Sequence, residues 1–594
     1  MITYRIDLSL AHAHRFIVTL QVAKPQPQVV LELPVWIPGS YLVREFARNL
    51  NALQASQGGK PCAVQQLGKA SWQVNCTGKG VLSVQYEVYA NDPSVRAAFL
   101  DNRRGFFNGT STFLSVQGLQ DTPHRVQITG LPKGWSVASA LPAVKTDARG
   151  QGWYEAPNHD ALVDHPVELG VFWRGSFQVR GVLHELVVSG ASDHADLDRL
   201  LKDTQAICAQ EISFWHGRRK PPFNRYVFLL NVVEDGYGGL EHRDSTALIC
   251  SRKDLPRQGV STQSEGYTTL LGLISHEYFH TWNVKRLKPK EFAPYDYSRE
   301  NHTQMLWFFE GFTSYYDDLI LLRSGLLKPA DYLKLLNKPI NQVLATPGRL
   351  QQSVAQASFD AWTRYYRPDE NTANSTVSYY TKGSLVALCL DLSLRLGAPR
   401  ADGTTPSLDG VMQRLWNLQC PIDQGDVEQA LSDEATTPPP HGKDWAQMLN
   451  TWVHGVGELP LEDLLSRFGI EWTNKPPSVT QQWGLRAQER VDGLRVQAVM
   501  RCSPAEDAGL SAGDELLALN GWRLKKAEDL QNWRTAKGPQ TLLICRDQRL
   551  QEVRLPHGHD KPTGWGLSAV ITARPATAMD KPTQARQQAW LHQG

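Results

Sequence analysis

Two histidines and a glutamate in a short apolar stretch are the strongest chemical signal in this sequence. The pattern His276-Glu277-Tyr278-Phe279-His280 lies in an apolar run that suits a buried helix. Side chains four residues apart share one face of a helix, so both imidazoles can reach a single tetrahedral zinc ion. The glutamate beside the first histidine can reach a water molecule on that ion. The pattern therefore predicts a hydrolytic zinc site, with two core histidines bonded to the backbone as the alternative.

A catalytic zinc ion needs a third protein ligand and an open position for water. Glu310 is a single carboxylate within the strongly apolar segment from Leu306 to Tyr316. A buried carboxylate is costly unless it is paired or binds a metal. We expect Glu310 to be the third ligand; a salt bridge or a cap at a helix end is the alternative.

The two segments together resemble a known family of zinc peptidases. His276–Arg286 and Glu310–Tyr316 look like the matching segments of the glycyl aminopeptidase family of gluzincins, which is related to aminopeptidase N. Trp282 and the Glu-Gly-Phe run that starts at Glu310 stand where aminopeptidase N has its tryptophan and its third ligand. The resemblance implies one zinc ion per chain, bound by His276, His280 and Glu310.

The segment Gly236–His242 extends the resemblance toward an exopeptidase. It is similar to the aminopeptidase N strand whose glutamate binds the free α-amino group of the substrate, which implies that role for Glu241. The small residues Gly238 and Gly239 would let a substrate backbone pair with the strand edge. A glycine turn followed by an exposed glutamate is the alternative interpretation.

Tyr379–Gly383 resembles the aminopeptidase N element whose tyrosine stabilises the oxyanion of the transition state. The Lys-Gly spacing favours Tyr380 for this role, and Tyr379 would then be a core aromatic residue. No role follows from the sequence for the neighbouring polar residues His242, Asn283, Lys285 and Arg286.

The elements that must position these residues follow from hydrophobic periodicity. Short alternating runs over residues 1–175 predict an N-terminal antiparallel β-sandwich. Residues 176–470 begin with strands, such as 225–233, and then turn helical at 267–283 and 305–322. That order predicts a thermolysin-like catalytic domain with a helical bundle, and a multidomain α+β protein overall.

Two C-terminal segments complete the organisation. Residues 480–556 closely resemble a PDZ domain of the bacterial protease type, through the run Ser503–Gly521. Trp483-Gly484-Leu485 would be its carboxylate-binding loop, although a rigid spacer without a peptide ligand fits equally well. Residues 557–594 are polar, and we expect a poorly ordered tail there. The segment Leu33–Arg44 resembles the β domain of the same family, so the resemblance covers nearly the whole chain.

Composition limits the remaining possibilities. The 594 residues carry a net charge of +2, with 62 basic and 60 acidic residues and no basic stripe, which argues against a nucleic-acid partner. Eight scattered cysteines without a Cys-x-x-Cys pair argue against a disulfide scaffold. We expect no membrane span, because no run of about 18 apolar residues occurs. The N-terminus has no apolar signal core, which predicts a cytoplasmic protein.

The leading hypothesis is a zinc aminopeptidase that removes an N-terminal residue, Gly or Ala by family resemblance, through a zinc-activated water. Its partners would be peptides with a free N-terminus and, if the PDZ domain binds one, a peptide ligand. The alternatives are a zinc endopeptidase that recruits substrates through the PDZ domain and a peptide-binding scaffold without catalysis.

Overall fold

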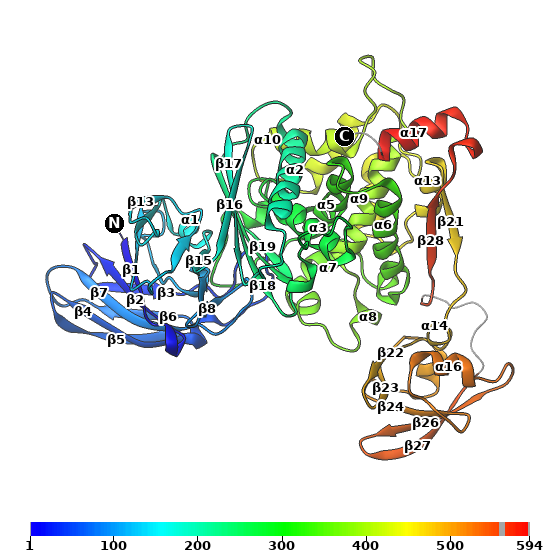
Figure 1. Cartoon of the computed structure of the whole chain (residues 1–594), viewed down its shortest axis with the longest axis horizontal. Helices are drawn as coiled ribbons and strands as arrows, with labels where there is room; N and C mark the ends of the chain where they lie inside the picture. Colours follow the sequence, from blue (N-terminus) through cyan, green and yellow to red (C-terminus); the bar gives the residue numbers. More distant parts are fainter. Residues whose placement is uncertain (1, 557–564, 592–594) are drawn as a thin grey trace. The chain divides into compact units, whose positions relative to one another are not determined.

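The computed structural model of this chain describes residues 2–556 and 565–591. It contains two compact units, a first unit of residues 1–301 and a second unit of residues 302–594. Figure 1 traces the chain from the N-terminal strands, in blue, to the last helix, in red.

An eleven-stranded sheet forms most of the N-terminal part of the first unit. Its strands alternate buried and outward side chains, as at Ile2, Tyr4 and Ile6 of β1, which is the period of two from which strands were predicted. Neighbouring strands are antiparallel except β1 and β11, which are parallel. In order across the sheet they are β10 (Ser115–Val116), β3 (Gln28–Glu32), β6 (Ser71–Asn75), β5 (Lys60–Gly68), β4 (Leu50–Gln57), β7 (Leu82–Tyr89), β2 (Arg15–Val22), β1 (Ile2–Leu10), β11 (His124–Thr129), β14 (Gly152–Ala156) and β13 (Ala143–Thr146).

A second sheet of four strands packs against this one. The Phe16 ring of β2 lies 5.5 Å from the Phe107 ring of β9, and both belong to one continuous hydrophobic core. The predicted N-terminal β-sandwich is therefore confirmed. The short helix α1 (His159–Val163) precedes β15, and the four strands in order are β12 (Ser136–Ala138), β15 (Val167–Gly170), β9 (Arg104–Phe107) and β8 (Ala98–Leu100).

A five-stranded mixed sheet completes the first unit. It places β19 (Tyr237–Glu241) at one end, paired antiparallel with β20. The helix α3 (Glu265–Phe279) packs against β19 and β20. The other elements are β16 (Trp173–Val179), β17 (Val182–Ser189), α2 (Leu197–His216), β18 (Arg225–Val233) and β20 (Ser245–Ser251).

The second unit begins with helices arranged around α9 (Tyr379–Arg395), which is buried on almost every side. The predicted helix at 305–322 is divided at Glu310 into α4 (Leu306–Phe309) and α5 (Gly311–Arg323). The other helices are α6 (Pro329–Leu344), α7 (Val354–Phe359), α8 (Thr372–Ser375), α10 (Leu408–Leu418), α11 (Gln424–Glu434), α12 (Trp445–Val453) and α13 (Leu461–Arg467).

A small β domain with its own hydrophobic core follows the helices. This is the predicted PDZ domain, and its strand β22 lies at one end of the sheet. Its elements are α14 (Val479–Trp483), β22 (Leu485–Arg490), β23 (Gly493–Val499), α15 (Pro504–Asp507), β24 (Glu515–Leu519), β25 (Trp522–Arg523), α16 (Ala527–Trp533), β26 (Gln540–Arg546) and β27 (Arg549–Leu555).

The C-terminal residues 565–591 are ordered, so the expectation of a poorly ordered tail was wrong for this stretch. The strand β28 (Ala569–Ala573) pairs with β21 (Ile470–Asn474), and α17 (Lys581–Leu591) follows it. Trp590 is fully buried, and its ring lies 5.9 Å from that of Phe468. The polar composition of this segment gave no indication that Trp590 would be buried. Residues 557–564 and 592–594 lie outside the described part of the chain.

Candidate metal and peptide site

The last turn of helix α3 carries His276, and His280 caps the C-terminal end of this helix. The helix begins at the cap residue Ser264, whose hydroxyl accepts a hydrogen bond from the backbone N–H of Tyr267. The Nε2 atoms of His276 and His280 lie 3.1 Å apart. His280 donates its Nδ1–H to the carbonyl oxygen of Asn283 at 2.8 Å, because a carbonyl can only accept. Nε2 of His280 therefore carries the ring's lone pair, and it is the atom that would bind a metal ion.

Glu310 supplies a carboxylate that matches these nitrogens. It follows α4 directly, and its side chain is 1% exposed. One ligand atom from each of His276, His280 and Glu310 lies within 4.8 Å of the others. Two imidazole nitrogens and one carboxylate oxygen are a donor set that zinc accepts in catalytic sites. The residues present therefore fit a zinc ion.

The same helix places Glu277 against the strand β19. A methyl group built on Gly239 would overlap the Glu277 carboxylate, so the two residues are in close contact. A larger residue at position 239 would have to displace the Glu277 carboxylate. Glu241, at the end of the same strand, is 4% exposed. Strand β19 therefore contacts the predicted general base, Glu277 of α3, at Gly239, and carries the predicted amine-binding residue, Glu241, at its end.

The backbone at Gly39 lies next to the C-terminal end of β19, where it contacts the Glu241 side chain. A methyl group on Gly39 would lie 2.6 Å from the Cδ carbon of Glu241 and overlap both carboxylate oxygens. Gly39 also has φ of +90°, which favours glycine. The segment Leu33–Arg44 that resembles a family β domain therefore reaches the carboxylate of Glu241.

The predicted oxyanion residue Tyr380 is held close to Glu310 by a helix crossing. A methyl group on Gly311 of α5 would lie 2.6 Å from Cα of Gly383 in α9, so the helices touch through these two glycines. Burial, and next the Glu310 carboxylate, raises the pKa of the Tyr380 hydroxyl, which keeps it a hydrogen-bond donor. Tyr379 is fully buried, whereas the Tyr380 side chain is partly exposed.

A buried charge network lies behind the turn that follows β19. Asp164 pairs with the Lys285 ammonium at 2.7 Å, lies 3.2 Å from His242 Nδ1, and accepts the backbone N–H of Arg243. Burial opposes ionisation of Asp164, but Lys285 and His242 hold its pKa well below its usual value. Arg286 donates to the carbonyl oxygen of Arg243 at 2.7 Å. Polar residues with no role predictable from sequence thus brace the β19–β20 turn.

Sequence reasoning missed Asp164 and Gly39. No motif marks Asp164, because its partners lie far away in the chain. Gly39 lies in a segment whose only predicted feature is its family resemblance. The Pro38-Gly39 pair, which indicates a turn, is the one signal in the sequence that could have drawn attention to it.

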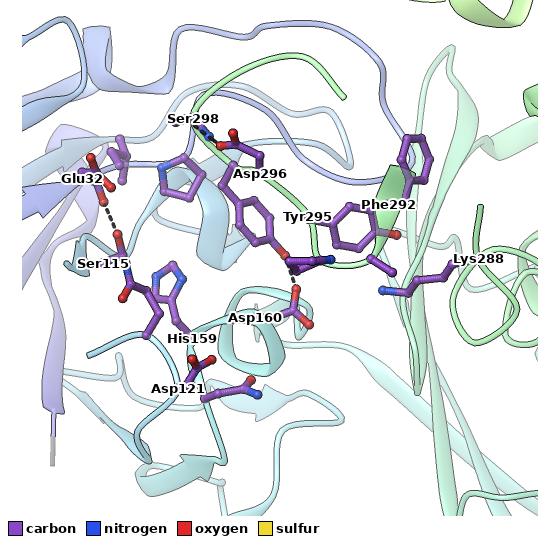
Figure 2. Close-up of a pocket in the computed structure, with 17 residues that line it drawn as sticks. Glu32, Ser115, Asp121, His159, Asp160, Lys288, Phe292, Tyr295, Asp296 and Ser298 are labelled. Carbon is purple, nitrogen blue, oxygen red and sulfur yellow. Dashed lines mark hydrogen bonds between the residues drawn. The ribbon is translucent and has the colours of Figure 1, made fainter. Parts of the chain in front are cut away.

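A cavity of about 640 Å³ lies elsewhere in the first unit. Figure 2 shows it between the end of β3, the start of α1 and the segment after Arg286, with Asp160, Lys288 and Tyr295 on its walls. The Tyr297 hydroxyl donates to Asp160 at 2.6 Å. Burial, with the nearby Lys285 ammonium, lowers the pKa of Lys288 to about 8. None of the predicted site residues lines this cavity.

The predicted carboxylate-binding loop of the PDZ domain contacts the C-terminal segment. Gly484 ends α14 with φ of +69° and accepts the backbone N–H of Met500. The buried Trp565 donates its Nε1–H to the carbonyl oxygen of Gln481 at 2.8 Å. Trp483 is itself buried, so it supports the loop from inside.

Comparisons with known proteins agree with the geometry. Residues 3–171 match a family described as the peptidase M61 N-terminal domain, residues 269–386 match M61 glycyl aminopeptidase, and residues 472–544 match a PDZ domain. The crystal structure of an aminopeptidase N family protein from Idiomarina loihiensis is 36% identical, with all of both chains covered and a TM-score of 0.89.

Two more distant matches complete the comparison. An M1 zinc metallopeptidase from Deinococcus radiodurans, bound to a Tyr-Ser-Ala substrate, is 15% identical over 77% of this chain and 94% of its own, with a TM-score of 0.44. A probable periplasmic serine endoprotease, DegP-like, from Chlamydia trachomatis is 36% identical over 93 residues, 15% of this chain. The chain spans 18% of the length of that curated relative.

None of the helices in the described part of the chain combines the length and the apolar character that crossing a membrane requires.

Proposed function

We infer that this chain, which belongs to the M61 glycyl aminopeptidase family, is a zinc-dependent aminopeptidase that removes an N-terminal glycine or alanine from peptides. The observation that carries the proposal is the placement of Glu277 and Glu241 along one edge strand, next to two histidines that converge on one point. The preference for glycine or alanine rests on the family alone.

His276, His280 and Glu310 would hold the zinc ion, which when bound supplies a Lewis acid that lowers the pKa of water to about 7. Glu277 accepts a proton from the attacking water and returns it to the leaving amine. The Tyr380 hydroxyl donates a hydrogen bond to the oxyanion. Glu241 binds the substrate ammonium and so sets the cleavage position.

The contact between Gly39 and Glu241 favours an aminopeptidase over an endopeptidase. An endopeptidase must let its substrate continue past the position that Glu241 occupies. The Gly39 backbone lies against the Glu241 carboxylate, where such a chain would have to pass. The buried Glu277 also argues against a scaffold without catalysis. A protein that only binds peptides does not require a carboxylate that can act as a base close to two adjacent histidines.

The sharpest test is the variant Glu277→Gln. We expect zinc content to stay at one ion per chain, because Glu277 is not a ligand in this proposal. Hydrolysis of glycine and alanine anilides should fall about a hundredfold to ten-thousandfold, the usual contribution of a general base. Metal analysis and initial rates on the same preparation provide both readouts.

Glu265→Gln is the matched control, because Glu265 is an exposed residue in the first turn of the same helix. It should keep the parent activity. N-acetylated substrates separate the exopeptidase from the endopeptidase: acetylated and free anilides cleaved at equal rates would overturn the aminopeptidase assignment. An endopeptidase would also retain its activity in Glu241→Ala.

A further inference from the structure

The unpaired edge of β19 can be identified from its hydrogen-bond register. His242 donates its backbone N–H to Ser245 at 2.9 Å, so these two residues form a hydrogen-bonded pair. Antiparallel pairs alternate, which makes Gly239 and Leu248 a pair without mutual hydrogen bonds. The N–H and C=O of Gly239 therefore point away from β20. Because β19 is the last strand of this sheet, they point to its open edge.

Arg96 lies at this edge. Its Nη2 donates to the carbonyl oxygen of Gly239 at 3.3 Å, and its Nη1 would lie 3.7 Å from a methyl group on Gly238. The side chain comes from the segment between β7 and β8, where Val95 and Ala97 are buried in the core. The guanidinium is thus held over the two glycines by a firmly anchored backbone.

The charge of Arg96 has no anionic partner among the residues that the structure describes. Its side-chain donors make the hydrogen bond to Gly239, and its Nε is shielded from solvent without an acceptor. An arginine keeps its charge at any physiological pH, and a partly buried charge without a counterion is unfavourable. A guanidinium in this condition is suited to a carboxylate, which it can bind through two parallel hydrogen bonds.

The direction in which a substrate would bind identifies the carboxylate that Arg96 would meet. This step rests on the proposed function. With the ammonium at Glu241, the last residue of β19, the peptide must run back along the strand toward Tyr237, antiparallel to it. Its scissile carbonyl then lies beside Glu277, which contacts Gly239. Residues after the scissile bond continue past Gly239 and Gly238, at about 3.3 Å per residue.

We propose that Arg96 binds the C-terminal carboxylate of the substrate, and that the preferred substrates are therefore peptides of two or three residues with a free C-terminus. Longer peptides would place an uncharged backbone at Arg96 and leave its charge unmatched. Arg96 is then a residue that determines specificity, separate from those that act on the scissile bond.

The test compares the dipeptide Ala-Leu with its C-terminal amide. In the parent enzyme we expect kcat/KM for the free acid to exceed that for the amide by about tenfold to a hundredfold, as for one hydrogen-bonded charge pair. In Arg96→Gln this ratio should fall to about one, and in Arg96→Lys it should be intermediate. Arg103→Gln, at an exposed arginine of the same domain, is the matched control and should keep the parent ratio.

Two outcomes would overturn the inference while leaving the aminopeptidase intact. One is equal cleavage of acid and amide by the parent enzyme. The other is an equal loss on both substrates in Arg96→Gln, which would show that Arg96 only supports Gly239. Failure of the proposed function looks different, because the parent enzyme would then cleave neither dipeptide nor anilide. Calorimetric binding of the two dipeptides to Glu277→Gln gives a readout that does not depend on turnover, and the same ratio is expected there.

Discussion

His280 illustrates how a metal ligand is prepared by its neighbours. Its Nδ1–H is used by the carbonyl oxygen of Asn283, and only its Nε2 faces the Nε2 of His276. This arrangement selects one tautomer before any metal binds, so less ordering is needed on binding. The backbone carbonyl of Asn283 therefore orients the His280 ring, a role that cannot be predicted from the type of its side chain.

Gly39→Ala tests the contact that positions Glu241. A methyl group there overlaps the Glu241 carboxylate and requires an unfavourable φ of +90°. We expect kcat/KM for alanine anilide to drop about a hundredfold, since a displacement of about 1 Å at an active site can have that effect. Steady-state kinetics measure the change.

Gly59→Ala is the control for backbone strain alone. Gly59 has a similar φ of +79°, but no atom lies within 4 Å of the position of its added methyl group. It should keep parent activity and lose only some stability. If both variants lost activity equally, strain in the β domain would explain the result and the Glu241 contact would not.

At the scale of elements, each unit has one close contact through glycine that holds predicted site residues. The edge strand β19 lies against α3 through a glycine, and α5 crosses α9 through two glycines, Gly311 and Gly383. Each glycine stands next to or near a predicted functional residue in sequence. The Glu-Gly and Lys-Gly pairs in the motifs therefore have a packing explanation, because no other residue lets the backbones approach so closely.

Gly383→Ala should weaken the crossing of α5 and α9. Alanine is favoured over glycine in a helix by up to about 1 kcal/mol. However, its methyl group would lie 2.6 Å from the carbonyl oxygen of Trp307, and overpacking destabilises by about 1–3 kcal/mol. We expect a lower melting temperature and lower activity, because Tyr380 and Glu310 are displaced. Differential scanning calorimetry and anilide kinetics provide the measurements.

Gly457→Ala serves as the comparison, because no atom lies within 4 Å of its added methyl group. Its melting temperature should not decrease. A higher melting temperature in Gly383→Ala would mean that helix propensity outweighs the crowding, and the close crossing would lose its explanation.

At the scale of the whole chain, buried histidines tie stability to pH. Burial lowers the pKa of His184 to about 4, and burial with the adjacent His124 lowers that of His159 to about 4. Unfolded histidines have pKa values of about 6.5. Between these values the unfolded chain binds more protons, so the free energy of unfolding falls as pH decreases from about 6.5 to 4. Each residue accounts for roughly 3 kcal/mol of this loss.

His184→Gln should therefore flatten the dependence of stability on pH between 4 and 6.5. Urea unfolding at several pH values measures the slope, which is independent of any constant loss of packing. His12→Gln, at an exposed histidine, should leave the slope unchanged. An unchanged slope in His184→Gln would show that this residue is not the buried neutral histidine described.

Much of the fold could be predicted from local patterns. Strand β18 has the predicted ends, Arg225 and Val233, because its run of apolar residues gives a strong local signal. The C-terminal helix α17 could not be predicted, since one buried tryptophan in a polar segment gives no periodic signal. The predicted domain boundaries near residues 175 and 470 stay predictions.

The sequence by itself determined which residues are candidates for chemistry, because the spacing of His276, Glu277 and His280 acts within one helix. Only the tertiary structure decided which residues from distant parts of the chain lie beside β19 and the turn that follows it. Arg96 and Gly239 are 143 residues apart, and His242 and Asp164 are 78 apart. Contacts over such separations leave no periodic trace in a single chain, since they depend on how sheets and loops are brought together on folding.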